Sequence, residues 1–414
     1  MQLTILRDGI HLTGTLGGSV QTAADTVAVP QPSELAVRYY RTGNALWGVE
    51  LALSLLIPAL LLLSGLSARL RDLAQRIGRR WLPTVAMYAL LFTLVTALLM
   101  LPLSYYEGYL RQHAFGLSNQ SFARWFSEWL KGVAVGGIGL SLVLWIPYLL
   151  LRKSPGRWWL YAGLATIPVA ALVLVITPVW VDPIFNEYGP MKDKSLEARI
   201  LALAQRAGIE GGRVYQVNKS VDTRTVNAYV TGAGNTKRIV LWDTILDKLE
   251  PNQILFVTAH EMGHFVLRHT LAFIVLAAGL TTVSLYVVHR VAGRLIARFS
   301  RRLGFDRLSD VASFPLLLLL GRLVALILTP AVLAFSRYQE READRFALEI
   351  TRDNRAAAST FVRLQQENLT IPRPGRLYTL WRGSHPSLGE RIDFANHYRP
   401  WETGEELKYG HLFR

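Results

Sequence analysis

The most prominent feature of the chain is a series of apolar runs, each about as long as the 20 residues with which a helix crosses a bilayer. Between them lie short polar stretches rich in Arg and Lys. The runs cover approximately residues 45–66, 82–103, 133–151, 158–180, 270–292 and 313–334. Pro168 and Pro178 fall in the fourth run, where neighbouring helices can cover the carbonyls that they free. The pattern predicts a mainly α-helical, polytopic membrane protein with about six spans.

Two stretches outside these runs have the pattern of a small α+β unit. Helical spacing of apolar residues predicts a helix over 195–207. Strands are predicted at 214–217, 225–230 and 238–242, with a turn at 232–235. A second helix is predicted to begin at Pro251, a residue favoured in the first helical turn, and to continue directly into the fifth span.

The same pattern divides the chain into five parts. A polar N-terminal segment, 1–44, contains an alternation at 3–12 that is compatible with a small hairpin or a loosely packed tail. Spans one to four occupy 45–180, with a loop at 104–132 whose aromatic residues favour an interfacial amphipathic helix over a substrate-binding surface. A soluble segment follows at 181–269, then spans five and six at 270–336, and a second soluble segment at 337–414.

Composition supports a lipid bilayer, and no nucleic acid, as the partner of this chain. Hydrophobic residues make up 51% of it, and 45 basic against 30 acidic residues give a net charge of +15. A nucleic-acid-binding protein would carry this excess in soluble patches, whereas much of it lies here in short loops between apolar runs, as in membrane proteins. The chain contains no cysteine, so a metal site must use His and carboxylate ligands.

One motif carries recognisable chemistry: His260-Glu261-Met262-Gly263-His264. Residues four apart on a helix share a face, so the two imidazoles can hold one Zn²⁺ while Glu261 reaches a water on its open side. His269 is nine residues beyond His260, about half a turn away on a continuous helix, and is therefore expected to stay apart from the pair.

A third ligand is expected after the sixth span, where Glu340 and Asp344 lie four residues apart on a predicted helix. One carboxylate can bind the metal while the other accepts the N–H of a ligating imidazole and selects its tautomer. The alternative is an ordinary solvated helix start. Two histidines and one carboxylate leave the fourth position of a tetrahedral zinc ion open for water, as catalytic sites require.

With these motifs the chain resembles the type I CAAX prenyl protease family, which includes the a-factor-converting enzyme. The resemblance covers roughly residues 105–400. It rests on the two motifs above and on three weaker blocks: Asp182-Pro-Ile-Phe-Asn186, Val226-Asn-Ala-Tyr229, and Ser384-His-Pro386 with Glu390-Arg391. It implies a zinc metalloendopeptidase with a small zincin-like domain among its membrane helices.

The resemblance also implies residue roles. His260, His264 and Glu340 would bind one zinc ion, and Glu261 would be the general base. Asp344 would orient a ligating histidine. The strand at Asn227, Ala228 and Tyr229 would pair with an extended peptide substrate. His385 and Arg391 would stabilise the oxyanion or hold the C-terminal carboxylate of the substrate.

Two departures from the family affect the expected substrate and topology. Eukaryotic members have seven spans around an enclosed chamber, and six are expected here. We expect a bacterial inner-membrane protein, so a prenylated or otherwise lipidated substrate is only one option, and quality control of membrane proteins is the nearest alternative. Loops 69–80, 152–157 and 294–307 contain 13 Lys and Arg against 6 in 1–44 and 104–132, which favours a periplasmic site, whereas the family favours a cytosolic one.

The sequence leaves two alternatives to this peptidase, a non-catalytic membrane protein and an intramembrane protease. A non-catalytic channel or scaffold with a chance motif predicts no stoichiometric metal. An intramembrane protease of the site-2 type needs the histidine pair deep within a span, whereas His260 precedes the fifth apolar run.

Overall fold

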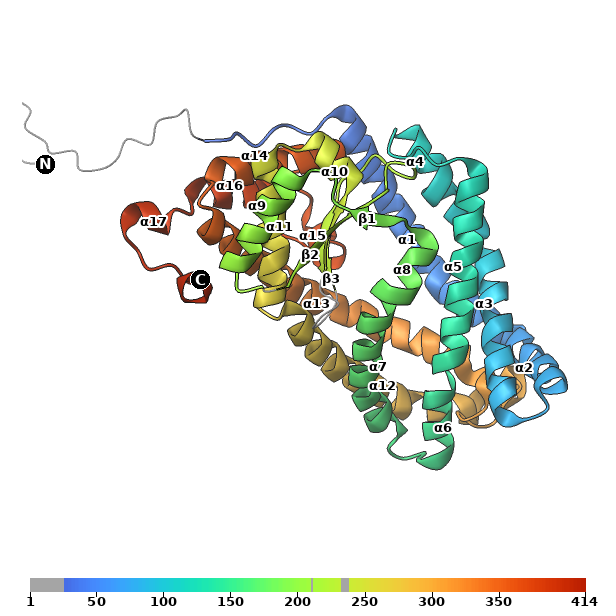
Figure 1. Ribbon diagram of the computed structural model, residues 1–414. Helices are drawn as coiled ribbons and strands as arrows, with labels where there is room; N and C mark the ends of the chain where they lie inside the picture. Colours follow the sequence, from blue (N-terminus) through green and yellow to red (C-terminus); the bar gives the residue numbers. More distant parts are fainter. Residues whose placement is uncertain (1–25, 210, 232–237) are drawn as a thin grey trace, which may run out of the picture.

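The computed structural model describes residues 26–209, 211–231 and 238–414 (Figure 1). The hairpin considered at 3–12 and the turn predicted at 232–235 lie outside these residues.

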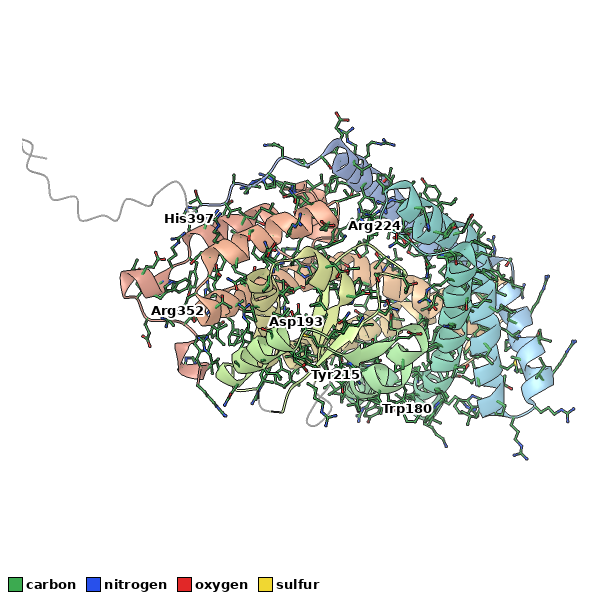
Figure 2. All side chains as sticks on the ribbon, turned by 45° about the horizontal axis from the view of Figure 1, so that its top comes forward. Trp180, Asp193, Tyr215, Arg224, Arg352 and His397 are labelled. Atoms are coloured by element: carbon green, nitrogen blue, oxygen red, sulfur yellow. The ribbon has the colours of Figure 1, made fainter. Side chains whose placement is uncertain are left out.

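Within the described ranges, six helices are long and apolar enough to cross a membrane, which confirms the expected fold class. Four of them include a short adjoining π-helical, 3₁₀ or α-helical segment. Their bounds are α1 (Glu34–Leu63); α3 (Trp81–Tyr105) with η1 (Tyr106–Leu110) and α4 (Arg111–Ala114); α5 (Phe122–Val143) with α6 (Trp145–Lys153); α7 (Trp158–Ile176) with η2 (Thr177–Val181) and α8 (Asp182–Phe185); α12 (His269–Leu303); and η4 (Val311–Ser313) with α13 (Phe314–Thr351). Many of their apolar side chains face outward, as a lipid solvent allows; Trp180 is 73% exposed and lies on the outer side in Figure 2.

Two boundaries differ from the sequence-based expectation. The first span begins inside the segment expected to be polar, because Ser33 accepts a hydrogen bond from the amide of Ala36 and caps α1. The aromatic stretch 104–132 is not a separate interfacial helix. It consists of the ends of two long helices, joined by residues 115–121. Their aromatic rings contact one another: Tyr105 stacks on Tyr109 and meets the Trp125 ring at a tilt.

The first soluble segment forms a four-stranded sheet of order β1-β2-β4-β3. Strands β2 and β4 are parallel, and the two other pairs are antiparallel. The strands are β1 (Tyr188–Pro190), β2 (Arg213–Val217), β3 (Ala228–Thr231) and β4 (Arg238–Trp242). Helix α9 (Lys194–Arg206) precedes β2, and α10 (Asp243–Lys248) and α11 (Pro251–Val266) follow β4. Strand β1 was not expected, because three residues carry no detectable alternation.

Two hydrophobic cores lie at opposite ends of α13, the helix drawn diagonally in Figure 1. One joins the sheet, α9 and α11 to the end of α13 and to the C-terminal helices. The other packs the membrane helices around α2 (Leu66–Gly78). The C-terminal elements are α14 (Asn354–Glu367), α15 (Arg376–Trp381), α16 (Leu388–His397), α17 (Pro400–Thr403) and η5 (Gly410–Leu412). The two soluble segments therefore share one core although two spans separate them in sequence.

Candidate metal centre

Helix α11 carries the two histidines of the motif. It begins with a reciprocal capping box, in which the Glu250 side chain and the Gln253 side chain each accept a backbone amide, and Pro251 occupies its first turn. His260 and His264 lie on one face as expected, with their Nε2 atoms 3.1 Å apart. Helix α11 has 16 residues and precedes α12, which is one of the six apolar helices.

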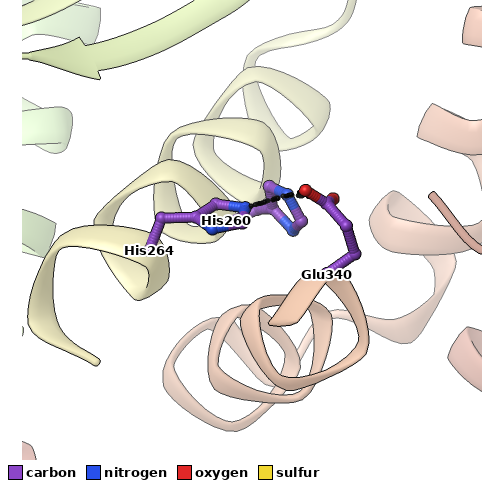
Figure 3. Close-up of side chains that lie close together, drawn as sticks. All are labelled: His260, His264 and Glu340. Carbon is purple, nitrogen blue, oxygen red and sulfur yellow. Dashed lines mark hydrogen bonds and ion pairs between the residues drawn. The ribbon is translucent and has the colours of Figure 1, made fainter. Parts of the chain in front are cut away.

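Glu340 approaches this pair from α13, which continues without a break from the sixth span into the soluble unit. The Glu340 carboxylate places Oε2 3.2 Å from His260 Nε2 and Oε1 3.3 Å from His264 Nε2 (Figure 3). The close approach depends on Gly263, where an added Cβ would lie 3.2 Å from the Cα of Ala343 on α13. The three side chains thus offer ligand atoms within 4.8 Å of one another.

These residues fit a tetrahedral metal ion. Ligand atoms about 2.0–2.1 Å from a tetrahedral zinc ion lie about 3.3 Å from one another, close to the separations found here. In addition, Glu340 Oε2 is buried and accepts no hydrogen bond of good geometry within the described structure. A cation among the two Nε2 atoms and this oxygen would satisfy all three.

Asp344 and Arg391 support His260 from behind. Asp344 Oδ1 lies 2.8 Å from His260 Nδ1, and Arg391 donates to both oxygens of Asp344 at 2.8 and 2.6 Å. An Nδ1–H that donates to Asp344 leaves the Nε2 lone pair directed at the metal position. Burial lowers the pKa of His260, but the neighbouring Asp344 and Glu340 carboxylates outweigh burial and raise that pKa to about 10. The two carboxylates therefore stabilise positive charge at this ring, whether it is carried by the protonated imidazole or by a bound metal ion.

Glu261 lines a cavity of about 120 Å³ beside the histidines, together with Asn227, Ala228, His385 and Arg391. Burial raises the pKa of Glu261, although the neighbouring histidines oppose this shift. A carboxylate with a raised pKa is a better proton acceptor than an exposed one, which suits a general base.

The two side chains expected to share one role, His385 and Arg391, occupy different positions. His385 is exposed and reaches the site, with Nε2 3.3 Å from Glu340 Oε2 and Nδ1 2.8 Å from Ser384 Oγ. Arg391 is only 8% exposed; it donates two hydrogen bonds to Asp344, and its Nη2 also lies 3.4 Å from His260 Nδ1. Both Arg391 and His385 line the cavity, but only Arg391 is paired with Asp344.

The three residues expected to bind the substrate strand do not all line the cavity. Asn227 and Ala228 line the cavity beside Glu261. Tyr229 is not among the lining residues and places its hydroxyl 3.0 Å from that of Tyr188. Ala228 and Tyr229 are successive residues of β3 and therefore point to opposite faces of the sheet, whereas Asn227 precedes the strand. Strand β3 stands last in the sheet order, next to β4.

The expectation for His269 was wrong, because α11 and α12 are not one continuous helix. Helix α11 ends at Val266, and Arg268 adopts a left-handed conformation (φ 55°) that redirects the chain. His269 Nδ1 then lies 3.0 Å from His264 Nδ1, and Gln339 donates to the His269 carbonyl at 2.9 Å. His269 thus supports His264 as Asp344 supports His260. Neither Gly nor Pro marks this break in the sequence.

Comparisons with known proteins agree with this architecture. Residues 190–399 match Peptidase family M48, and residues 32–187 match the CAAX prenyl protease N-terminal family, described as five membrane helices. The chain is 38% identical over 380 residues to the uncharacterized metalloprotease YhfN of Bacillus subtilis, covering 90% of this chain and 88% of that protein. It is 29% identical over 322 residues to CAAX prenyl protease 1 of Saccharomyces cerevisiae, covering 73% and 70%.

The crystal structure of S. mikatae Ste24p has the same fold. It superimposes with a TM-score of 0.69 at 24% sequence identity, covering 78% of this chain and 79% of that one. With six apolar helices and a match over more than half of its length, the chain belongs to peptidase family M48 and is an integral membrane metalloprotease.

Proposed function

We propose that the chain is a zinc-dependent endopeptidase that cleaves peptides at the membrane surface, in the manner of the CAAX prenyl proteases. His260, His264 and Glu340 would hold one Zn²⁺. The observation that carries this assignment is the convergence of their three ligand atoms from α11 and α13, with a buried Glu340 oxygen that has no hydrogen-bond partner of its own. A bound zinc ion lowers the pKa of a water molecule and polarises a peptide carbonyl.

The side chains of the site would perform the proton transfers. Glu261 accepts a proton from the attacking water and delivers it to the leaving amine. Asp344, held by Arg391, keeps the tautomer of His260 that binds the metal. His385 donates a hydrogen bond to the negative charge that develops on the carbonyl oxygen, which favours the transition state over the ground state.

An extended peptide would reach these groups along β3. Proteins of several folds bind an extended peptide by adding it as a strand to an exposed sheet edge. The position of β3 at the end of the sheet order and the presence of Asn227 and Ala228 in the cavity support this mode. A second cavity of about 460 Å³, which shares His385 and Arg391, extends toward α1 and α15 and offers room for the rest of the peptide.

Replacing Glu261 with Gln tests the assignment. Loss of the general base lowers the cleavage rate by roughly 10²–10⁴-fold, while the zinc content of the purified protein stays at one ion per chain, because Glu261 is not a ligand. The matched control is Glu402→Gln, an exposed residue of α17. Cleavage that persists in Glu261→Gln would overturn the mechanism, and the absence of stoichiometric metal in the wild type would favour a channel or scaffold.

The class of substrate is tested separately. The names of the yeast and human relatives refer to prenylated CAAX proteins, which supports a lipidated substrate, whereas a quality-control protease would act on unmodified membrane proteins. A prenylated peptide and its unprenylated counterpart, incubated in parallel with the protein in detergent, distinguish these duties. Preference for the prenylated peptide supports the first and equal cleavage supports the second.

We further propose that segments 181–269 and 337–414 form a single catalytic unit in a bacterial inner membrane. Their shared hydrophobic core supports the first statement. The excess of Lys and Arg in loops 69–80, 152–157 and 294–307 supports a cytoplasmic location for those loops, and hence a periplasmic catalytic unit.

A further inference from the structure

The basic loops at the end of the molecule away from the metal centre meet around one cavity. Its volume is about 690 Å³, and it is lined by residues from the α2–α3 loop, the end of α6 and the α12–α13 loop. In Figure 1 these elements lie at the lower right, and the sheet and α11 lie at the upper left. Five arginines line the cavity, with one acidic residue among the lining residues: Arg71, Arg79, Arg80, Arg152, Arg307 and Asp310.

Asp310 offsets the charge of Arg71 and leaves the other four arginines without it. Arg71 lies 2.5 Å from Asp310 Oδ2, and Asp310 Oδ1 accepts the amide of Ala312 at 2.9 Å. Arg71 also donates to the carbonyl of Gly304 at 3.2 Å. This group of contacts holds the α12–α13 loop against α2 and so gives the cavity a fixed wall.

The remaining arginines have no strong counter-charge in the described structure. Arg79 and Arg80 are exposed and belong to no ion pair there. Arg152 lies over the ring of Trp81 at 4.8 Å, and Arg307 is 3.9 Å from Asp306, with both side chains largely exposed. Four guanidinium groups around one cavity repel one another unless an anion with several oxygens lies between them. Phosphate is such an anion, and the planar donor fork of Arg matches its geometry.

Exposed apolar side chains on α2 and α3, outside the residues that line the cavity, indicate the source of the phosphate. Leu73 and Ile77 of α2 and Leu82 of α3 are 44%, 52% and 50% exposed. Helix α2 therefore combines an exposed apolar surface with several arginines, which is the composition of a helix at a membrane interface. A ligand that satisfies both features has an anionic head and apolar chains.

We propose that this cavity binds the phosphate headgroup of an anionic phospholipid, whose acyl chains lie along the exposed apolar residues of α2 and α3. Basic pockets between membrane helices are suited to such headgroups. The proposal is independent of the metal centre, which lies in the other hydrophobic core.

The test uses the full-length protein in uncharged detergent and two lipids with identical acyl chains, phosphatidylglycerol and phosphatidylcholine. Binding is measured by native mass spectrometry. The double variant Arg79→Gln/Arg80→Gln removes two charges from the cavity. Its matched control, Arg301→Gln/Arg302→Gln, removes the same charge from the last turn of α12, from residues that do not line the cavity.

We expect the wild type to bind phosphatidylglycerol at least roughly tenfold more tightly than phosphatidylcholine, and the cavity variant to lose about tenfold or more of that affinity. The control variant retains it. Equal losses in the two double variants, or equal binding of the two lipids, would overturn the proposal. Arg307→Gln, which changes a side chain that is 76% exposed, replaces the double variant if the latter does not fold.

A parallel titration with glycerol phosphate distinguishes a phospholipid headgroup from a soluble phosphate compound as the ligand of the cavity. Because that molecule lacks acyl chains, we expect at least about tenfold weaker binding than for phosphatidylglycerol. Binding of glycerol phosphate as tight as that of the lipid would mean a soluble phosphate ligand and would refute the lipid assignment.

Discussion

At the scale of residues, the candidate site depends on which nitrogen of each histidine faces the metal position. Free imidazole exists as two tautomers, and a partner at Nδ1 selects the one whose Nε2 lone pair is available. Asp344 is that partner for His260 at 2.8 Å, and His269 is that partner for His264 at 3.0 Å. The first partner is an anion and the second is an imidazole. The two ligands are therefore supported by groups of different charge.

His269 can be tested as a positioning residue. Replacing His269 with Ala removes the acceptor for His264 Nδ1–H, and we expect zinc affinity to fall about 10- to 100-fold, as for other groups that orient metal ligands. Gln at this position keeps an acceptor and should restore part of the affinity. Competition with a chromophoric chelator measures the change. The exposed His411, replaced by Ala, is the control; unchanged affinity in His269→Ala would show that the contact is incidental.

Asp243 links the sheet to the pH dependence of stability. Its carboxylate accepts the amides of Lys219, Ser220 and Thr244, and the hydroxyl of Ser220. Burial raises the pKa of Asp243, but these hydrogen bonds outweigh burial and lower it below the ordinary value. A carboxyl with a lowered folded-state pKa stabilises the fold above its unfolded pKa of about 3.9, and the contribution is lost as pH falls through the folded pKa.

We therefore expect Asp243→Asn to lower the unfolding temperature at neutral pH and to make the unfolding temperature less sensitive to pH below about 4. Thermal unfolding measured from pH 3 to pH 7 in detergent checks this. The exposed Asp247, replaced by Asn, should leave both the unfolding temperature and its pH dependence unchanged.

At the scale of elements, the centre is made by the crossing of α11 and α13. Gly263 allows the backbones to approach, since a Cβ there would lie 3.2 Å from both Ala343 Cα and the Phe346 ring. The contact lies beside His264 and one turn from Glu340, so the spacing of the helices sets the spacing of the ligands. The motif glycine thus has a packing reason as well as a place in the pattern.

Gly263→Ala should push the two helices apart. Overpacking of this kind costs about 1–3 kcal/mol, and we expect both the unfolding temperature and the zinc affinity to fall. Gly279→Ala on α12 is the matched control, because nothing lies within 4 Å of a Cβ added there. If zinc affinity is unaffected while stability falls, the helix spacing does not govern the ligand geometry.

At the scale of the whole molecule, α13 connects the membrane region to the catalytic unit as one unbroken helix from Phe314 to Thr351. The sixth span and the third candidate ligand therefore move together. The basic cavity and the metal centre lie at opposite ends of the spanning helices (Figure 1). Determining the side of the membrane on which one of them lies therefore determines the side of the other.

The absence of cysteine allows a direct test of topology. Lys192→Cys places one exposed thiol beside the sheet, and Arg157→Cys places one in a basic loop. By the charge distribution of the loops, we expect a membrane-impermeant maleimide to label Lys192→Cys in intact spheroplasts and Arg157→Cys only after permeabilisation. The opposite result would place the catalytic unit in the cytosol.

The amino-acid sequence by itself determined the features that depend on local physics. Spans are recognisable because a bilayer requires about 20 apolar residues in a row. Helical periodicity places His260 beside His264 whatever surrounds them, and Glu340 beside Asp344 in the same way. The number of spans, the fold class and the two helix faces that carry the candidate ligands were predictable for this reason.

Only the tertiary structure decided what depends on contacts between distant segments. It placed His269 against His264, since the break at Arg268 is accompanied by a contact with Gln339 seventy residues away. It paired Arg391 with Asp344 and placed His385 beside Glu340. It also gathered arginines from three loops around one cavity. Local periodicity carries no information on such pairings, because their energy arises only when the helices pack.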